Sequence, residues 1–411
     1  MKPYTQLLFA LFSGAVLGLF FHSQYENIFL RNFNDFILFS IGQIFLRLIF
    51  MIVVPMVVSA LTIGAFELAS EGGLGKTAIK TFFLTLVTSS ASVIIGVSLV
   101  NFFHPGSGNL QALTSSSGNI KSIENNVAQS KPIRDIILDL IPKNPIAAAV
   151  KALDGEMVSL MVFALIFGSA LGIVYVREKR KTGPVLSLAK ETFSICMRII
   201  DGIMKFAPIA VFALVFNVAF KHGHEIFISL AYYVLVVLLG LLLQQFGVYS
   251  IMLKFIGKTS PLSFFKKTRE VLLYAFATAS SNATLPYALE VAEKDLKIPS
   301  KISRFVLTVG STANQNGTAL FEGVTVLFLA QVYGIDLSFV QQTTVVLMSV
   351  LAGVGTAGVP GGSLPLILIL LQQMGIPAEG LGLVLGVDRF LDMCRTSVNV
   401  SGDLVIAKCQ A

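Results

Sequence analysis

Residues 353–363 read Gly353-Val354-Gly355-Thr356-Ala357-Gly358-Val359-Pro360-Gly361-Gly362-Ser363 and interrupt an apolar run that extends from about residue 337 to about residue 372. Five glycines and one proline stand where a helix would otherwise continue, and both residue types disfavour helix interiors. No lysine or arginine lies between Phe305 and Asp388. The pattern predicts two apolar helices joined by a non-helical segment, in a part of the chain without basic loops.

The composition around this segment is that of a membrane protein. Of 411 residues, 55% are hydrophobic and only 13% are charged, about half the charged share of an ordinary soluble domain. Such a chain cannot cover its surface with polar groups, and about 20 residues per crossing leave little room for a separate soluble domain. The 30 lysines and arginines are scattered between apolar runs, so we expect no nucleic-acid partner and interpret the charge as a topology signal.

Apolar runs predict the membrane-spanning segments, and basic loops predict their orientation. The runs lie at about 7–21, 36–68, 75–103, 145–176, 187–220 and 225–254, with less regular ones after 260. Basic clusters at 177–181, 254–269 and 294–304 should be cytoplasmic. No small-x-small cleavage site follows the first run, so we expect it to be retained. We therefore expect a multi-pass protein of the plasma membrane, the bacterial inner membrane, with both termini in the cytoplasm.

A second interrupted segment lies between two of these cytoplasmic clusters. Residues 270–293 contain one apolar excursion, broken by Ser280-Ser281-Asn282-Ala283-Thr284-Leu285-Pro286. A segment that starts and ends on one side of the membrane is a re-entrant hairpin, and its tip should line a cavity. The segment broken at 353–363 lacks basic flanks and is expected to enter from the outside. Two broken segments of opposite entry indicate inverted repeats with a binding site between their tips.

The last apolar run carries a polar stripe. Its members are Asp388, Asp392, Arg395, Asn399 and Asp403. At about 100° per residue all five lie within roughly 80° of one helix face. Arg395 can meet a carboxylate with two parallel hydrogen bonds, and Asp392 can meet an ammonium group, so the pair predicts a receptor for an acidic amino acid. Arg389 lies about 100° from Asp388 and is expected at a protein interface or lipid headgroups.

Three alternatives to this interpretation remain open. Asp392 and Arg395 could form a structural ion pair, although three acids and one base on one face leave charge without a partner. The stripe could instead line the pore of an anion channel. An intramembrane aspartyl protease that uses Asp388 and Asp403 is disfavoured, because both lie on one helix and the chain has no Gly-x-Gly-Asp motif.

A third interruption falls within the run 299–331. The sequence Thr312-Ala313-Asn314-Gln315-Asn316-Gly317-Thr318 places three amide side chains and a glycine in mid-span, so we expect the helix to unwind there. Carbonyl groups freed by such a break can coordinate a monovalent cation. Interhelical amide hydrogen bonds are the alternative.

On these motifs the chain resembles the dicarboxylate/amino acid:cation symporter family, which includes the excitatory amino acid transporters. The resemblance covers essentially the whole chain. It implies an all-α membrane protein with eight transmembrane helices, two re-entrant helical hairpins and inverted repeats, assembled as a homotrimer in lipid. It also implies an elevator mechanism in which a transport domain moves against a scaffold domain. The implied parts are scaffold helices 1 and 2 in 1–72, transport-domain helix 3 in 73–104, scaffold helices 4 and 5 with an extracellular loop in 105–220, and the remaining transport domain in 221–411.

The resemblance also assigns site residues. Substrate contacts are implied at Ser281, Thr318, Val359, Gly362, Asp392, Arg395, Thr396 and Asn399. One sodium site is implied at Gly310, Asn314, Asn399 and Asp403, and a second at the carbonyl groups of Thr312, Gly353, Val354 and Thr356. A third cation site is built in the family from a Thr-Ser pair, here Thr88 and Ser89, and from the broken-helix position that is Asn316 here.

Two departures from the family pattern affect the third site. The family's broken helix usually reads Asn-Met-Asp-Gly-Thr, whereas this chain has Gln315 and the neutral Asn316. The tyrosine that commonly precedes the Thr-Ser pair by three residues is Thr85. Without a carboxylate the desolvation of a cation is poorly compensated, so we expect no sodium there and either fewer sodium ions per cycle or a shift toward protons.

The sequence thus predicts a symporter that imports L-glutamate or L-aspartate. Its coupling ions would be Na+, H+ or both, and no organic cofactor or enzymatic activity is expected. A C4-dicarboxylate symporter is the alternative. Asp392 favours an amino acid, because a dicarboxylate has no cationic group to offer it.

Overall fold

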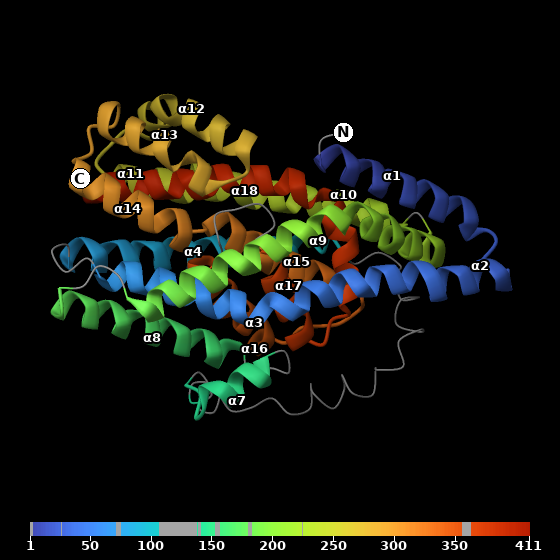
Figure 1. Ribbon diagram of the computed structural model, residues 1–411. Coiled ribbons are helices and arrows are strands. Elements are labelled where there is room, and N and C mark those ends of the chain that lie inside the picture. Colours follow the sequence, from blue (N-terminus) through green and yellow to red (C-terminus); the bar gives the residue numbers. More distant parts are fainter. Residues whose placement is uncertain are drawn as a thin grey trace.

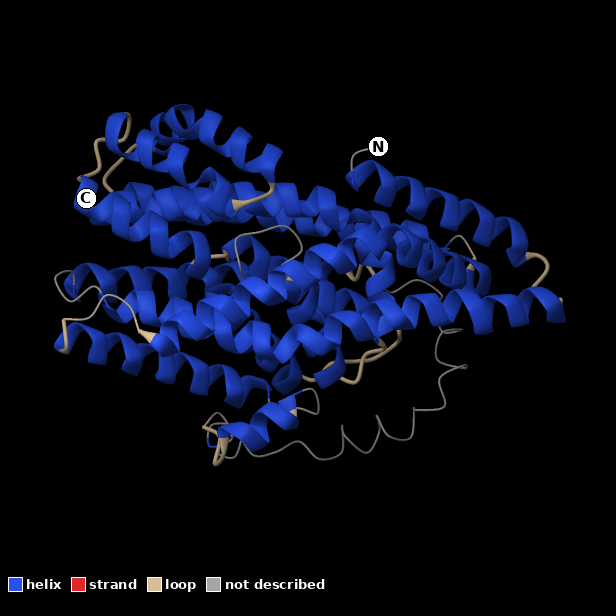
Figure 2. Ribbon diagram, in the orientation of Figure 1, coloured by secondary structure: helices blue, strands red, loops and turns tan. Residues whose placement is uncertain are grey.

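The computed structural model describes residues 3–25, 27–70, 75–106, 138, 141–152, 157–179, 183–223, 225–355 and 363–411. Every regular element in these ranges is a helix (Figure 2), as the sequence predicts. The longer helices are α1 (Pro3–His22), α3 (Phe39–Ser70), α4 (Gly75–Phe103), α8 (Met157–Arg177), α9 (Pro184–His222), α10 (Glu225–Leu242) and α18 (Leu381–Gln410). The short α2 (Ile28–Phe33) leads through a π-helical turn (Asn34–Leu38) directly into α3, and α7 (Pro145–Val150) precedes α8.

Several of these helices are long and apolar enough to cross a membrane. In the described residues they are Ile28–Glu67, Ile79–Phe103, Ser159–Arg177, Pro184–Lys221 and Phe227–Phe255. Shorter apolar helices are Phe9–His22, Phe339–Gly353 and Leu364–Gln373. Large apolar side chains point outward from them, among them Phe20, Phe102 and Leu235, each more than half exposed. Such a surface suits contact with lipid rather than with water.

The helices pack in two groups. In the first, α3 packs against α8 and α9, and α1 packs against α9 (Figure 1). Small residues let the backbones of this group come close, because a Cβ on Gly168 of α8 would overlap the backbone oxygen of Thr62 in α3. In the second group, α18 contacts α10, and α4 packs against α10. Helices of the C-terminal part that follow α10 also pack against α18, as described below.

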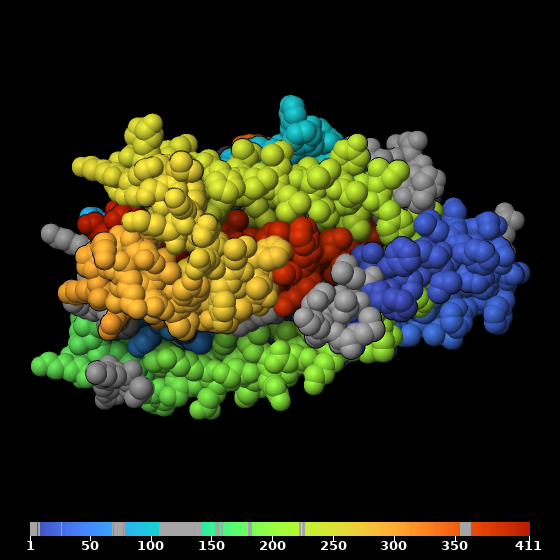
Figure 3. Space-filling view, turned by 90° about the horizontal axis from the view of Figure 1, so that it is seen from above, coloured from blue at the N-terminus to red at the C-terminus, as the bar shows by residue number. Residues whose placement is uncertain are grey.

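The first broken segment is a helical hairpin. Helix α12 (Pro261–Thr278) and α13 (Ser281–Lys294) are joined at Ala279, which has left-handed backbone angles of φ 48° and ψ 37°. Ser280 caps α13, because its hydroxyl accepts the N–H of Ala283 at 3.2 Å. The break is therefore confirmed but confined to 279–280, and Pro286 lies inside α13. In Figure 3 this hairpin covers part of α18, and a strip of the C-terminal helix stays visible between it and the N-terminal helices.

The break predicted at 312–318 lies next to the end of the helix that leads into the glycine-rich segment. Helix α14 (Ser300–Ala313) ends two residues before α15 (Asn316–Val332), which confirms the predicted unwinding. Helices α16 (Phe339–Gly355) and α17 (Leu364–Gln373) lie on either side of residues 356–363, so the expectation of a non-helical segment from Gly353 onward was wrong for Gly353 to Gly355, which continue α16. The N–H of Gln315 donates to the carbonyl oxygen of Gly353 at 3.1 Å and so joins the break to the end of α16. Thr356, Val359 and Gly362 lie outside the described residues.

Candidate functional site

The polar stripe of α18 faces the interior. All five members are at least 93% buried: Asp388, Asp392, Arg395, Asn399 and Asp403. Helices α14 and α15 contact the stripe directly, with Gly310 of α14 next to Asp403 and Phe321 of α15 next to Arg395. The inward orientation expected from the helical spacing is confirmed, and the cost of burying these groups must be met by partners within the bundle.

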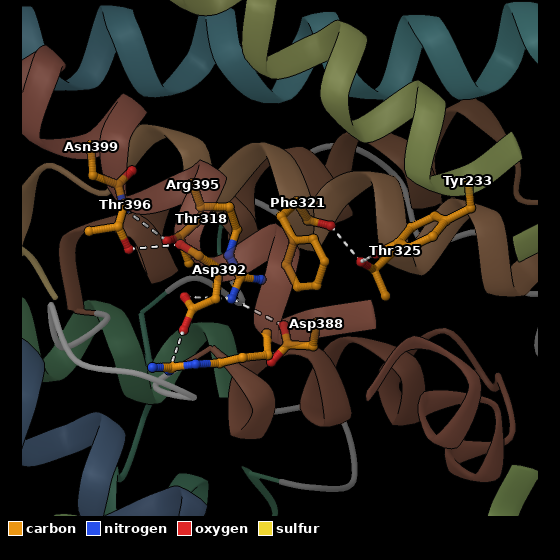
Figure 4. Close-up of polar contacts among 10 residues, drawn as sticks. Tyr233, Thr318, Phe321, Thr325, Asp388, Asp392, Arg395, Thr396 and Asn399 are labelled. Atoms are coloured by element: carbon orange, nitrogen blue, oxygen red, sulfur yellow. Dashed lines mark hydrogen bonds and ion pairs between the residues drawn. The ribbon is translucent and has the colours of Figure 1, made fainter. Parts of the chain in front are cut away.

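Arg395 stands at the centre of the stripe. Its Nη2 lies 2.8 Å from Asp392 Oδ1 and 3.1 Å from Asp388 Oδ1, and the guanidinium carbon lies 3.8 Å from the centre of the Phe321 ring. Figure 4 shows the two carboxylates and the ring around the guanidinium group. Nε and Nη1 have no hydrogen-bond partner within the described residues. A fully buried guanidinium with two free donor atoms can bind a further anionic group.

Asp392 is shared between two arginines. Its second carboxylate oxygen lies 3.7 Å from Arg389 Nη1, a contact that the expectation of an interface or headgroup position for Arg389 did not include. Arg389 is about 100° from Asp388 but only about 60° from Asp392 around the helix, within reach of a long side chain. The ion pair between Asp392 and Arg395, which the sequence left open as an alternative, is present. The Thr396 hydroxyl donates to the Asp392 carbonyl oxygen at 2.8 Å.

Asn399 connects the stripe to the broken helix. Its amide nitrogen donates to Gln315 Oε1 at 2.6 Å and to the Thr318 hydroxyl at 3.1 Å. Its amide oxygen accepts the N–H of Gly317 at 2.7 Å. Residue 317 must be glycine at this approach, because a Cβ there would lie 2.8 Å from the Arg395 carbonyl oxygen. Thr318, Arg395 and Asn399 are thereby brought together.

Ser281 is a further predicted substrate contact. It is the first residue of α13, it is 98% buried, and its hydroxyl has no hydrogen-bond partner within the described residues. The N–H groups of this first helical turn are suited to an anionic group, and α13 contacts α18.

The first predicted sodium site contains a buried acid. Asp403 Oδ1 accepts a hydrogen bond from Asn314 Nδ2 at 2.7 Å, and a Cβ on Gly310 would overlap the same carboxylate. No basic side chain pairs with Asp403 in the described part of the chain. Because a buried carboxylate without a counter-charge is costly, these three residues fit a monovalent cation. The resemblance also assigns Asn399 to this site, but its side chain is hydrogen-bonded to Gly317 and Thr318 of α15.

The second predicted sodium site is only partly described. Thr312 lies in the last turn of α14, and Gly353 and Val354 lie in the last turn of α16. The contact between Gln315 and Gly353 brings these two helix ends together. Thr356 completes the predicted set but lies outside the described residues.

The third predicted site is assembled but neutral. Ser89 donates to Asn316 Oδ1 at 2.6 Å, and the Thr88 hydroxyl lies 3.4 Å from the same atom. The Asn316 amide nitrogen donates to Tyr249, the first residue of α11 (Tyr249–Phe255), at 2.9 Å. The sequence interpretation missed Tyr249, since it lies 67 residues from Asn316 and no local spacing relates them.

Glu322 is a second residue that the sequence interpretation missed. It is fully buried in α15, and neither carboxyl oxygen has a hydrogen-bond partner within the described residues. Its position four residues after Thr318 places the two on one helix face, and this spacing could have identified it. A buried acid next to a predicted binding residue indicates function.

The chain is similar in sequence to known transporters of one family. The chain matches the model of the sodium:dicarboxylate symporter family over residues 4–411. It is 35% identical over 404 residues to the proton/sodium-glutamate symport protein of Bacillus subtilis, with 98% of this chain and 90% of that protein covered. The proton/glutamate-aspartate symporter of Escherichia coli is 34% identical over 412 residues, with 98% and 92% covered. Excitatory amino acid transporter 3 of Mus musculus is 30% identical over 438 residues, with 95% and 81% covered. Because the family match extends over nearly the whole chain and includes the broken helix and the buried stripe of α18, the chain belongs to the sodium:dicarboxylate symporter family.

Proposed function

We propose that this chain is a secondary active symporter that imports L-glutamate or L-aspartate together with Na+, H+ or both. The observation that carries the proposal is the fully buried Arg395, which keeps two donor atoms unpartnered between two carboxylates. The bacterial relatives are named as symporters of glutamate or of glutamate and aspartate, coupled to protons or to protons and sodium.

The substrate would be held at both of its charged ends. The Nη1 atom of Arg395, which has no hydrogen-bond partner within the described residues, would bind the side-chain carboxylate with a charge-assisted hydrogen bond. Asp392 would accept the α-ammonium group, and the buried Ser281 hydroxyl with the N-terminal turn of α13 would bind the α-carboxylate. The selection of an amino acid over a dicarboxylate would then depend on Asp392.

The coupling cation would neutralise Asp403. Gly310, Asn314 and Asp403 would hold it beside the end of α14. Substrate and cation together leave the buried stripe with less unpaired charge, and this reduces the cost of moving it through the membrane. The cation is therefore cargo whose binding makes the movement of the loaded transporter favourable.

The elevator mechanism, the homotrimer and the membrane orientation belong to the same proposal. The group around α18 would move against the group of α1, α3, α8 and α9. A contact between the groups would have to break in each cycle, because Gln43 of α3 donates to Glu379, in the turn before α18, at 2.6 Å.

We place the protein in the bacterial inner membrane, with eight spans, two re-entrant hairpins and both termini in the cytoplasm.

Replacing Glu322 by glutamine is expected to abolish uptake driven by a pH gradient while preserving substrate binding. The buried carboxyl can cross the membrane neutral when protonated, and glutamine keeps its shape without the exchangeable proton. Uptake of labelled L-aspartate into proteoliposomes, with the outside more acidic, measures this. Glu293→Gln is the control, since that acid pairs with Arg304 near the surface at 3.2 Å and should leave uptake unchanged. Full pH-driven uptake by Glu322→Gln would contradict the assignment.

The proposed function itself is tested by calorimetric titration of the purified protein. L-glutamate, L-aspartate and succinate are compared with and without Na+ and at two pH values. We expect the amino acids to bind in a cation-dependent manner and succinate to bind much more weakly. Preferential binding of succinate would reassign the chain as a C4-dicarboxylate symporter, and a substrate-independent anion current would favour a channel.

A further inference from the structure

A buried cluster of five neutral side chains fills the place where the family resemblance implies a third cation. We call it the amide–hydroxyl cluster, and its members are Thr88, Ser89, Ser92, Tyr249 and Asn316. None of the five is exposed to any measurable extent. The cluster joins α4, α11 and the first turn of α15, so it holds three helices of the group around α18 together.

The hydrogen bonds of the cluster are complete. Asn316 Oδ1 accepts the Ser89 hydroxyl at 2.6 Å, and Asn316 Nδ2 donates to Tyr249 Oη at 2.9 Å. The Tyr249 hydroxyl donates to the Val398 carbonyl oxygen at 3.2 Å, and Ser92 donates to the Asn316 carbonyl oxygen at 2.7 Å. None of these side-chain polar atoms is among the unpartnered buried atoms of the described residues. A satisfied buried network is costly to open.

A glycine on α18 makes room for the central pair. A Cβ on Gly402 would lie 2.5 Å from Tyr249 Oη and 2.9 Å from Asn316 Nδ2. Any larger residue would push the hydroxyl and the amide apart. Tyr249 directly follows a π-helical turn (Leu243–Val248) in the span of α10 and α11, and such turns shift the direction of the side chains that follow. Two separate segments, the π-helical turn before Tyr249 and Gly402 on α18, thus accommodate the contact between Tyr249 and Asn316.

The cluster does not fit a cation. A monovalent cation needs several oxygen acceptors and, in a dry site, a compensating negative charge. Here the amide nitrogen of Asn316 directs hydrogen atoms at Tyr249, and its amide oxygen already accepts the Ser89 hydroxyl. Binding an ion would break these bonds and bring no carboxylate in return. The third cation site of the family pattern is therefore lost for two reasons: residue 316 is neutral, and its amide group is already hydrogen-bonded to Ser89 and Tyr249.

We propose that the pair of Asn316 and Tyr249 is an internal replacement for a coupling cation. The amide donates the hydrogen bond that closes the cluster, so α4, α11 and α15 stay joined throughout the cycle without an ion. This chain would then bind one Na+ fewer than the same chain with aspartate at position 316. The consequence for transport rests on the proposed function, but the cation site itself can be tested without substrate.

The test is a gain of sodium binding on replacing Asn316 by aspartate. Thermal unfolding of the purified, amino-acid-free protein is followed at pH 8 from 0 to about 500 mM NaCl, with choline chloride as the ionic-strength control. We expect Asn316→Asp, alone or with Tyr249→Phe, to gain a Na+-dependent rise in Tm beyond that of the unmodified protein. In substrate titrations, the slope of log Kd against log [Na+] should become steeper by about one for the same variants.

Two further variants test whether an ion already binds at the amide–hydroxyl cluster of the unmodified protein. Asn316→Ala and Tyr249→Phe are expected to leave the sodium slope unchanged, since no ion binds at the cluster. A slope that falls by about one in either variant would overturn the proposal, as would an Asn316→Asp protein that folds but gains no sodium response. If Asn316→Asp is not recovered folded, Tyr249→Phe decides the question. Failure of the proposed function would show separately, as absence of amino acid binding with an intact Tm response.

Discussion

Replacing Arg395 by glutamine is expected to raise the Kd for L-glutamate and L-aspartate by at least about 100-fold. The change removes the charge that pairs with the substrate and leaves Asp388 and Asp392 buried without the cation they share. Truncating one partner of a buried charge pair costs about 2–5 kcal/mol, and every 1.4 kcal/mol is about tenfold in Kd. Isothermal titration of the purified protein at saturating cation concentration measures the effect.

Arg389→Gln is the matched control for this prediction. It removes the same charge from the same helix, but Arg389 is one third exposed and lies 3.7 Å from Asp392. A partly solvated pair of this kind contributes only about 0–1 kcal/mol, so the Kd should rise by less than about fivefold. Equal losses from both variants would show that overall charge rather than a specific contact determines binding. Unchanged affinity of Arg395→Gln would exclude Arg395 as the carboxylate receptor.

Replacing Asp403 by asparagine is expected to abolish transport driven by a cation gradient. Asparagine retains the shape of the side chain and can still accept the hydrogen bond from Asn314, but it carries no charge to compensate a dehydrated cation. The slope of log Kd for substrate against the logarithm of the coupling-cation concentration should fall by about one. Uptake into proteoliposomes under an imposed gradient should fall to the level of empty vesicles.

A second variant tests the same site without changing a charge. Gly310→Ala adds a methyl group that would overlap the Asp403 carboxylate, so it should displace that group and weaken cation dependence in the same direction. Asp35→Asn is the control, because Asp35 pairs with Lys221 at 3.1 Å and is partly exposed on the first helix group. Cation coupling that survives in Asp403→Asn would show that the cation binds elsewhere.

The polar stripe of α18 shows how much of the site follows from spacing alone. Asp388, Asp392 and Arg395 recur at intervals that a helix places on one face, and a membrane helix must turn such a face inward. The break at Asn314 and Gln315 was equally predictable, because consecutive amide side chains before a glycine are poor helix formers. In both cases the decisive interactions are local to a few helical turns.

The length of the break between α12 and α13 could not be predicted from the local sequence. The polar stretch from Ser280 to Pro286 predicts a broad break, yet only Ala279 and Ser280 leave the helical conformation. The Ser280 cap satisfies one N–H of α13, and the contacts of α13 with α12, α14 and α18 stabilise the residues that follow. Helix packing thus overrides weak local propensity along most of that stretch.

The sequence by itself determined that this is an all-helical membrane protein, that its last helix carries an inward polar stripe and that three segments interrupt their apolar runs. Those properties depend only on hydrophobic content and on the fixed period of the helix, and both follow from the local sequence. Only the tertiary structure decided that Arg389 reaches Asp392, that Glu322 has no partner within the described residues and that Tyr249 closes the bonds of Asn316. The identity of the partner of a buried polar atom depends on which helix packs opposite it, and residues far apart in the chain meet only when the whole bundle is assembled.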